Sequence, residues 1–263
     1  MIHFPFLNNA VVCQYPLAKV KTFRTIANQM ADGSQVKLSV AGSGRVSWEL
    51  HLGGLSQEEW DSIESFYLGR EGSLNTFVFL DPCDNLLCFS EEFGAEVWIK
   101  GPGLGLTSGA AGPFEGTTAT TIHNQGAAAA RLAQILNVPG DGTYCFSVYA
   151  RGAQNEQIAL VRHSGSGDQT RTFPLDDSWN RFTLPGSPGD EAEQVTFGIE
   201  LEPGATVDVF GAQVECQLGE STYKKTHDKS GIYPNARFEQ DSLAVSVDDP
   251  DQSSVTVRIT ARR

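Results

Sequence analysis

Residues 77–101 read FVFLDPCDNLLCFSEEFGAEVWIKG, and they join two patterns of different character. The apolar run 77–80 ends at Asp81-Pro82, a pair that is typical of the end of a strand. From Asn85 onward the sequence becomes polar and rich in glycine, and it keeps that texture for most of the remaining chain. The change predicts that one domain stops here and another begins.

The first segment, residues 1–83, predicts strands and one helix. QVKLSV (35–40) and RVSWELHL (45–52) alternate apolar and polar residues, and the turn sequence AGSG between them predicts a β-hairpin. The helix that follows begins with a capping box, in which Ser56 is the N-cap and Glu59 the third helical residue. Aromatic and aliphatic residues at helical spacing come after it.

The last segment, residues 227–263, has the same strand-like texture as the first. SLAVSVDD (242–249) and SVTVRITA (254–261) alternate and are joined by DPDQS, which predicts a second hairpin. Two strands are too short to bury a core alone. We therefore expect this hairpin to pair with the sheet of residues 1–83.

Between these ends lie short strands separated by turn signals at roughly ten-residue spacing, which is typical of a β-sandwich or jelly roll. AAAARLAQIL (127–136) is interpreted as a strand that forms a hairpin with 140–152 across an Asp-Gly turn. The sequence thus predicts a mainly β protein. Residues 1–83 and 227–263 form a discontinuous β-sandwich or barrel with one helix, and 84–226 form an inserted jelly-roll β-sandwich.

The formal net charge of the 263-residue chain is −13, and most of it lies in the middle. Residues 84–226 contain 18 Asp and Glu against 8 Lys and Arg. A phosphate-binding surface needs clustered Lys and Arg, so this balance argues against nucleic acid as a partner. No run of eighteen apolar residues predicts membrane insertion, and the N-terminus shows no secretory signal pattern.

Five cysteines are present and none forms a CxxC pair. Cys13, Cys145 and Cys216 lie in apolar strand-like runs, where a thiol acts as a small buried hydrophobe. Cys83 and Cys88 flank the change of pattern. The sequence leaves open whether these two form a disulfide.

The two ends resemble the distal tail or minor tail proteins of long-tailed phages, including the lambda-like minor tail family. The residues that carry the resemblance are Phe4-Pro5, DGS (32–34), WELHLGGLSQEEWDSIESFYLGREGSLNTFVFLDP (48–82) and YPNARFEQ (233–240) with the closing hairpin. They cover about 120 residues in two pieces. The order and spacing of these motifs are more specific than any one of them.

The middle resembles jelly-roll modules of phage tail and fibre proteins that are grouped with carbohydrate-binding modules. The matching stretches are NLLCFSEEFGAEVWIKG (85–101), GTYCFSVYARG (142–152), LDDSWNRFTL (175–184) and VDVFGAQVECQLGESTYKKT (207–226). In the last stretch, a Gly-Ala-Gln-x-Glu strand precedes a Thr-Tyr-x-x-Thr exit. This second resemblance is more specific than the first.

Together the resemblances imply a structural protein of the virion tail tip, made in the bacterial host cytoplasm. Family members form a ring beneath the tail tube, hexameric in the family, and inserted modules project toward the cell surface. The implied partners are other copies in the ring, tail tube and tail hub or tip proteins, and host cell-surface polysaccharide. Two alternatives stay open: a purely structural tail-tip protein whose inserted sandwich binds other tail proteins and no glycan, and a non-phage carbohydrate-binding accessory protein.

Sugar binding needs a planar aromatic ring that stacks on the apolar face of a pyranose, and polar groups that bind its hydroxyls. Tyr149 and Arg151 fall on one face of a predicted strand because side chains alternate along it. The other candidates share the required chemistry and are Trp98, Trp179, Gln157 and Arg162. Structural packing is the competing interpretation, above all for the two tryptophans.

The module resemblance also implies a structural Ca²⁺, which needs several carboxylate or carbonyl oxygens. Glu91, Glu92 and Asp208 are the candidate ligands, with Glu115 a weaker one. For catalysis the sequence offers no constellation: the five histidines are dispersed, and RHSGSGD (162–168) is interpreted as a hairpin turn rather than a nucleophile elbow. We therefore expect no enzymatic activity.

Overall fold

The computed structural model describes residues 1–114 and 118–262, and it is mainly β with one α-helix. The chain divides into two compact units. We call Ile2–Asn8, Val12–Phe79 and Tyr233–Arg263 the end unit, and Met1, Asn9–Val11 and Leu80–Ile232 the middle unit. The candidate calcium ligand Glu115 lies outside the described residues.

The end unit is built on one six-stranded sheet. Its elements are β1 (Leu17–Thr22), β2 (Thr25–Gln29), β3 (Gln35–Ser39), β4 (Arg45–Leu55), α1 (Gln57–Gly69), β5 (Phe77–Leu80), β16 (Ile232–Phe238), β17 (Val245–Asp249) and β18 (Gln252–Arg262). The strand order is β1-β4-β18-β16-β5, with β17 paired to β18. The sheet is open from edge to edge, so the described residues of this unit form no closed barrel.

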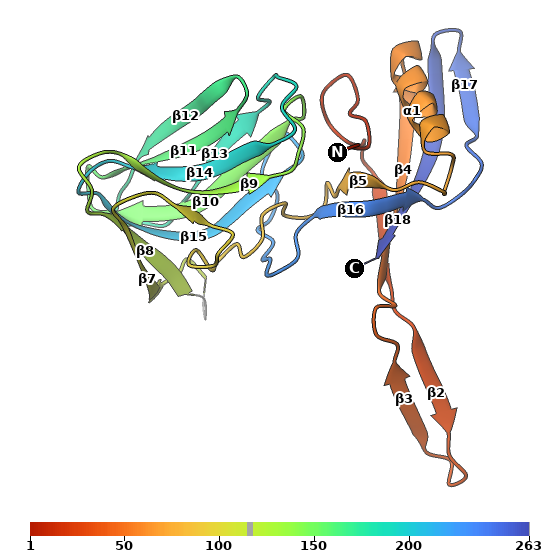
Figure 1. Cartoon of the computed structure of the whole chain (residues 1–263), viewed down its shortest axis with the longest axis horizontal. Coiled ribbons are helices and arrows are strands. Elements are labelled where there is room, and N and C mark those ends of the chain that lie inside the picture. Colours follow the sequence, from red (N-terminus) through yellow and green to blue (C-terminus); the bar gives the residue numbers. More distant parts are fainter. Residues whose placement is uncertain (115–117, 263) are drawn as a thin grey trace. The chain divides into compact units, whose positions relative to one another are not determined.

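The two ends of the chain share this sheet, as the sequence predicts. β18 lies antiparallel to β4, from Ser253 opposite Leu55 to Arg262 opposite Arg45, and Figure 1 shows the two strands side by side. The predicted terminal hairpin is confirmed as β17 and β18. Buried side chains of β4 alternate with more exposed ones, which gives the sheet one apolar face.

The predicted helix is confirmed, and so is its capping box. The hydroxyl of Ser56 accepts a hydrogen bond from the Glu59 backbone N–H, and the Glu59 carboxylate accepts one from the Ser56 N–H. Trp60 and Ile63 are the buried residues of the helix. Phe66, on the same helix, lies 5.2 Å from Phe77 of β5, ring centroid to ring centroid.

The predicted hairpin between residues 35–40 and 45–52 is wrong. β3 pairs with β2 in a two-stranded sheet of their own (Figure 1), while β4 pairs with β1 and β18. The turn lies instead at DGS, where Asp32 accepts hydrogen bonds from the N–H and hydroxyl of Ser34 and Gly33 has a φ of +81°. Only glycine adopts this conformation without strain, so DGS, and not AGSG, reverses the chain.

The middle unit is a β-sandwich of two five-stranded antiparallel sheets. Its strands are β6 (Ile99–Lys100), β7 (Leu104–Ala111), β8 (Thr118–Asn124), β9 (Ala130–Leu136), β10 (Tyr144–Gly152), β11 (Gln157–Ser164), β12 (Gly167–Pro174), β13 (Asn180–Gly186), β14 (Val195–Leu201) and β15 (Thr206–Glu215). One sheet has the order β13-β10-β15-β8-β7 and the other β12-β11-β14-β9-β6. We call the first the β10 sheet and the second the β14 sheet.

Alternation along the strands fills the space between the two sheets. Phe146 of β10 lies 6.0 Å from Phe197 of β14, centroid to centroid, and both are fully buried. β9 is a strand as predicted, but its predicted hairpin with β10 is wrong, because the two strands belong to different sheets. The residues of the Asp-Gly turn therefore carry the chain from one sheet to the other.

The chain enters and leaves the middle unit at neighbouring points. The Asp81 backbone N–H donates to the Gly231 carbonyl at 2.8 Å, and the Gly231 N–H donates to the Asn85 carbonyl at 2.7 Å. Asn85 is fully buried, and its side-chain amide binds backbone groups of β15 and of the segment that follows β15. The two connections are thus tied together by hydrogen bonds.

Two further sequence expectations concern cysteines and membranes. Cys13, Cys145 and Cys216 are buried, as expected, and Cys83 and Cys88 form no disulfide. Burial raises the pKa of Cys145 to about 12, which leaves its thiol protonated. Within residues 1–114 and 118–262, no helix has the length and apolar character needed to cross a membrane.

Candidate functional site

The outward face of the β10 sheet carries Tyr149 and Arg151. Ala150, between them, and Val148, just before Tyr149, are both fully buried. Tyr149 and Arg151 therefore point away from the sandwich core. Both side chains are half-buried. The alternation predicted from the sequence is therefore present, and the two residues share one surface.

Arg151 is held between an aromatic ring and a carboxylate. Its Cζ lies 4.9 Å from the centroid of the Trp179 ring, in cation–π geometry. Its Nε donates to Asp208 Oδ2 at 3.1 Å, and Asp208 Oδ1 accepts a hydrogen bond from the Thr121 hydroxyl at 2.6 Å. Arg151, Asp208 and Thr121 are register partners on β10, β15 and β8, so one polar row crosses three strands.

Tyr149 lies in a cluster of aromatic rings beside this row. Phe114, which is 45% exposed, contacts it edge-on with centroids 5.3 Å apart. Arg181 of β13, the register partner of Tyr149, places its Cζ 5.3 Å from the tyrosine ring. Arg181 in turn donates to the Ser221 carbonyl at 2.5 Å. The arginine side chains on this surface are therefore fixed by several contacts each.

We call Tyr149, Arg151, Trp179, Asp208 and Thr121 the β10 surface. The surface presents an indole, a guanidinium, a carboxylate and a hydroxyl side by side, each on a strand or directly before one. Groups held by a rigid sheet and by each other need little reorganisation when a ligand binds.

Another part of the β10 sheet's outward face is covered by residues 217–226. Tyr223 packs on Phe210 with centroids 5.4 Å apart, and the glycine at position 211 leaves room for its ring. A Cβ at Gly211 would lie 3.1 Å from the Tyr223 ring, and the φ of Gly211 is +64°. Thr226 ends the segment, and its hydroxyl donates to the Leu87 carbonyl at 2.7 Å. Tyr223 and Thr226 of the Thr-Tyr-x-x-Thr sequence thus hold residues 217–226 against one half of the face. We call this segment the cover.

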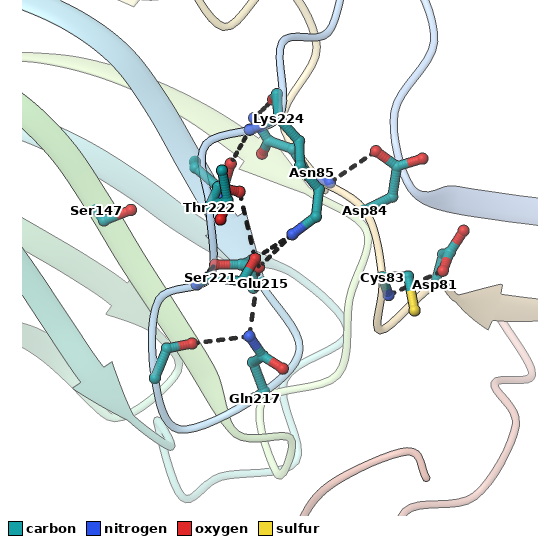
Figure 2. Close-up of polar contacts among 12 residues, drawn as sticks. Asp81, Cys83, Asp84, Asn85, Ser147, Glu215, Gln217, Ser221, Thr222 and Lys224 are labelled. Atoms are coloured by element: carbon teal, nitrogen blue, oxygen red, sulfur yellow. Dashed lines mark hydrogen bonds and ion pairs between the residues drawn. The ribbon is translucent and has the colours of Figure 1, made fainter. Parts of the chain in front are cut away.

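A buried ion pair anchors that cover. Glu215 of β15 is fully buried, and Lys224 Nζ lies 2.8 Å from its Oε1; Figure 2 shows Ser221 and Gln217 beside it. Burial acts to raise the pKa of Glu215, but the hydrogen bonds from Lys224 and Ser221 outweigh burial and leave the pKa below its usual range. The carboxylate is therefore ionised where it is paired.

Three of the predicted sugar-binding residues do not lie on the β10 surface. Trp98 is buried against Phe93, and its Nε1 donates to the Phe89 carbonyl at 3.1 Å. Arg162 is also buried, and its guanidinium donates to the Gly186 carbonyl at 2.5 Å. Gln157 is exposed on β11, which belongs to the β14 sheet. Trp98 and Arg162 thus serve packing, the competing interpretation for such residues.

The predicted calcium ligands do not come together. Glu91 pairs with Lys225 at 2.5 Å, and Glu92 lies 3.0 Å from His227 Nδ1. Asp208 is engaged by Arg151 and Thr121 on the β10 surface. Across the described part of the chain, no three His, Cys, Asp or Glu side chains are grouped as a metal would need. These residues therefore do not fit a calcium site, because their oxygens already face separate cations and donors.

RHSGSGD forms the predicted turn, between β11 and β12. His163 Nδ1 lies 2.7 Å from Asp168, whereas the Ser164 hydroxyl donates to Asp190 at 2.5 Å. The serine and the histidine thus have different acidic partners. Hydrogen bonds from Ser164 and from backbone N–H groups hold the pKa of Asp190 well below its usual range.

Some members of the β10 surface and its surroundings were not predicted from the sequence. Asp208 was expected as a metal ligand, and Thr121, Arg181 and Phe114 were not expected at all. Strand register decides which of them meet: Asp208 faces Arg151, and Arg181 faces Tyr149. Alternation in the sequence gives each residue a face, but no sequence signal gives the register between strands distant in sequence.

No protein-family model and no curated protein matches this sequence. Among solved structures, the enzymatically active domain of bacteriophage CBA120 tailspike protein 4 aligns at 14% identity and a TM-score of 0.43, over 53% of this chain and 22% of that one. A family 61 carbohydrate-binding module, solved with β-1,4-galactotriose, aligns at 15% identity and a TM-score of 0.41, over 51% of this chain and 99% of that one.

The C-terminal family 22 carbohydrate-binding module of a Clostridium thermocellum protein aligns at 18% identity and a TM-score of 0.41, over 52% of this chain and 96% of that one. This chain thus spans about a fifth of the tailspike domain and nearly the whole of each of the two modules. At these identities and scores, the alignments assign no function to this chain.

Proposed function

We propose that this chain is a structural tail protein of a long-tailed phage, prophage or tail-like particle, located at the tail tip of the virion. In this proposal the end unit builds a ring and the middle unit binds glycans on the host surface. The sequence motifs at the two ends, and the sheet that those ends share, support the first part. The β10 surface supports the second part.

The observation that carries glycan binding is the stack of Arg151 on Trp179, with Asp208 and Thr121 in the same row. A pyranose has an apolar face, which packs on aromatic rings, and hydroxyls, which bind guanidinium and carboxylate groups. On the β10 surface Trp179 supplies the aromatic ring, and Arg151 and Asp208 supply the polar groups.

The observation that supports ring building is the ribbon of β2 and β3, all ten residues of which are exposed. Ile26 and Leu38 face each other across the ribbon and are 44% and 52% exposed. A two-stranded ribbon alone is marginally stable in water, and one with an exposed apolar face gains stability when another chain covers it. A neighbouring copy in a ring supplies that cover.

The ring and the glycan site act together in this proposal. A single sugar contact on a shallow surface is weak. Several copies on one ring raise the effective concentration of each site near a polysaccharide, and so strengthen adhesion without new contacts. The wild-type middle unit therefore needs only modest affinity for one sugar.

The experiment that tests glycan binding is a glycan array probed with the full chain, followed by titration of each positive sugar. We expect Trp179→Ala and Arg151→Ala each to weaken binding about tenfold, the equivalent of about 1.4 kcal/mol. Arg171→Ala is the matched control, because Arg171 stacks on Phe173 in the same way on the β14 sheet, with its Cζ 4.8 Å from the ring centroid. It should bind sugar like the unaltered chain.

Two results would count against glycan binding. If no sugar binds at millimolar concentration, the middle unit is not an adhesion module, and the alternative in which it contacts other tail proteins takes its place. If sugars bind but Trp179→Ala and Arg151→Ala bind them equally well, the site lies elsewhere. Electron microscopy of intact particles with labelled chain tests the tail-tip location separately.

A further inference from the structure

Three arginines line one cavity of the end unit. The cavity has a volume of about 620 Å³ and is lined by Arg45, Arg237 and Arg262, with only uncharged residues besides. Arg45 and Arg262 are direct register partners at the end of β4 and β18. Like charges placed opposite each other on neighbouring strands destabilise a sheet. A negative charge from elsewhere would relieve this repulsion.

The described residues supply no such charge. None of these three arginines forms an ion pair with a carboxylate in residues 1–114 and 118–262, and Arg237 donates only to backbone carbonyls such as that of Ser73. Arg258, on the same strand as Arg262, shows the contrast, because its Nε lies 2.5 Å from Glu49 Oε2. Guanidinium groups bind carboxylates in a bidentate way, so the cavity suits an acidic group.

The opposite end of β18 carries acidic residues. Asp248 and Asp249 end β17, Asp251 lies in the turn before β18, and all three are exposed. Asp248 accepts a hydrogen bond from the Ser254 hydroxyl, whereas Asp249 and Asp251 have no ion pair among the described residues. We call residues 248–251 the acidic tip.

The acidic tip cannot reach the arginine cavity of its own chain. β18 has 11 residues between them, and a strand rises about 3.3 Å per residue, so the two lie roughly 35 Å apart. The tip and the cavity are complementary in charge and stand at opposite ends of one rigid strand. Complementary patches at opposite ends produce head-to-tail contacts, which close into rings when the rotation between copies allows it.

We propose that the arginine cavity receives the acidic tip of a second copy of this chain, in a repeated head-to-tail contact. This inference rests on the proposed ring and names the surfaces that close it. In this contact, Asp249 and Asp251 of one copy pair with Arg45, Arg237 and Arg262 of the next. The like-charge repulsion between Arg45 and Arg262 is thereby relieved by association.

Charge reversal tests the contact. The first variant carries Arg45→Glu and Arg262→Glu, and the second carries Asp249→Lys and Asp251→Lys. All four side chains are exposed, so both variants should fold. Self-association of the full chain is measured by sedimentation velocity over a range of concentrations, at low salt and at about 0.5 M salt.

We expect the unaltered chain to associate more strongly at low salt, and each variant alone to associate about 100-fold more weakly. An equimolar mixture of the two variants should restore association. The glutamates in the cavity of the first variant can pair with the lysines at the tip of the second. A control with Lys100→Glu and Arg171→Glu has the same change of net charge as the first variant, but on exposed strands of the middle unit. It should associate like the unaltered chain.

Each other result overturns the inference. If the unaltered chain associates and the two variants associate equally well, the ring closes through other surfaces, and the ring itself survives. If the variants are weakened but their mixture is not restored, the cavity binds some other acidic group, such as a free anion. If the unaltered chain stays monomeric at every concentration, the inference and the ring fail together, while glycan binding is tested independently.

Discussion

Lys224 and Glu215 form an ion pair in which the carboxylate is fully buried, with Nζ and Oε1 2.8 Å apart. The hydroxyl and the backbone N–H of Ser221 complete the hydrogen bonding of that carboxylate. A buried charge is costly without its partner, so the pair makes the cover over the β10 sheet depend on one lysine.

Replacing Lys224 by Met should destabilise the chain by about 3 kcal/mol or more, because it leaves the buried carboxylate of Glu215 without its cation. The free energy of unfolding in urea at neutral pH measures the loss. The neighbouring Lys225 is the comparison, since its side chain is 48% exposed, and its partner Glu91, 11% exposed, also accepts a hydrogen bond from the Tyr223 hydroxyl. Lys225→Met should therefore cost less than Lys224→Met, because Glu91 is less deeply buried than Glu215. Equal losses for the two variants would contradict a special role for Lys224.

The same pair predicts a pH dependence. The pKa of Glu215 is lowered in the folded chain, so its contribution to stability is present above the pKa of an unfolded glutamate, about 4.3, and is lost as the pH falls through the folded pKa. In Lys224→Met, burial acts on Glu215 without the opposing cation, and protonation then relieves the cost. We therefore expect the stability difference between the two chains to shrink below about pH 4. A difference that grows on acidification would contradict this.

Asn85 should be among the least replaceable polar residues of the middle unit. Its amide donates to the carbonyls of Ala212 and Lys224, and its Oδ1 accepts from the N–H groups of Leu87 and Val214. Asn85→Leu leaves four backbone groups without partners, at about 1–3 kcal/mol for each one that stays buried. Thermal unfolding should show a large loss, whereas Gln157→Leu, at an exposed amide of the same unit, should change stability by less than about 0.5 kcal/mol.

The capping box gives a smaller and separate prediction. Ser56→Ala removes the acceptor for the Glu59 N–H and should cost about 1 kcal/mol. Ser65→Ala, at an exposed position within the same helix, should be neutral or slightly stabilising because alanine has the higher helix propensity. Chemical denaturation of both variants separates the two effects. A loss for Ser65→Ala as large as that for Ser56→Ala would show that the cap contributes nothing of its own.

Removal of residues 82–230 should leave a chain that still folds. Asp81 and Gly231 are joined by a 2.8 Å hydrogen bond, so a linker of roughly four glycines can replace everything between them. We expect the shortened chain to unfold cooperatively, because its strands β4 and β18 keep each other as partners. The matched control also lacks 245–262 and should be unfolded. If the chain that lacks only residues 82–230 is disordered, the assignment of the two chain ends to one independent domain is contradicted.

How far the sequence predicts the fold depends on whether a signal is local. The capping box at Ser56 and the alternation in β17 and β18 are local, and both predictions are confirmed. No local signal determines which strand pairs with β3 or which sheet contains β10. Several turns and several sheet edges are available, and the pairing depends on which of them the folded chain uses. The two hairpin predictions that were wrong, 35–40 with 45–52 and 127–136 with 140–152, both took strands that follow each other in the sequence as partners.

The candidate site follows the same division. Alternation along β10 correctly puts Tyr149 and Arg151 on one face. The stacking of Trp179 on Arg151 depends on a loop that returns before β13, and the burial of Trp98 depends on Phe93 and the Phe89 carbonyl. Residue type alone could not separate these two tryptophans, since both have the chemistry that binds sugars and fills cores.

The ribbon of β2 and β3 has a consequence for how assembly can be followed. The residues of the ribbon are all exposed. Lys37 lies in β3 and Arg24 directly precedes β2, so trypsin can cleave there without first unfolding a core. A neighbouring copy that covers the ribbon would shield those bonds. The rate of tryptic cleavage therefore distinguishes chains waiting in solution from chains already built into a particle, with no label attached.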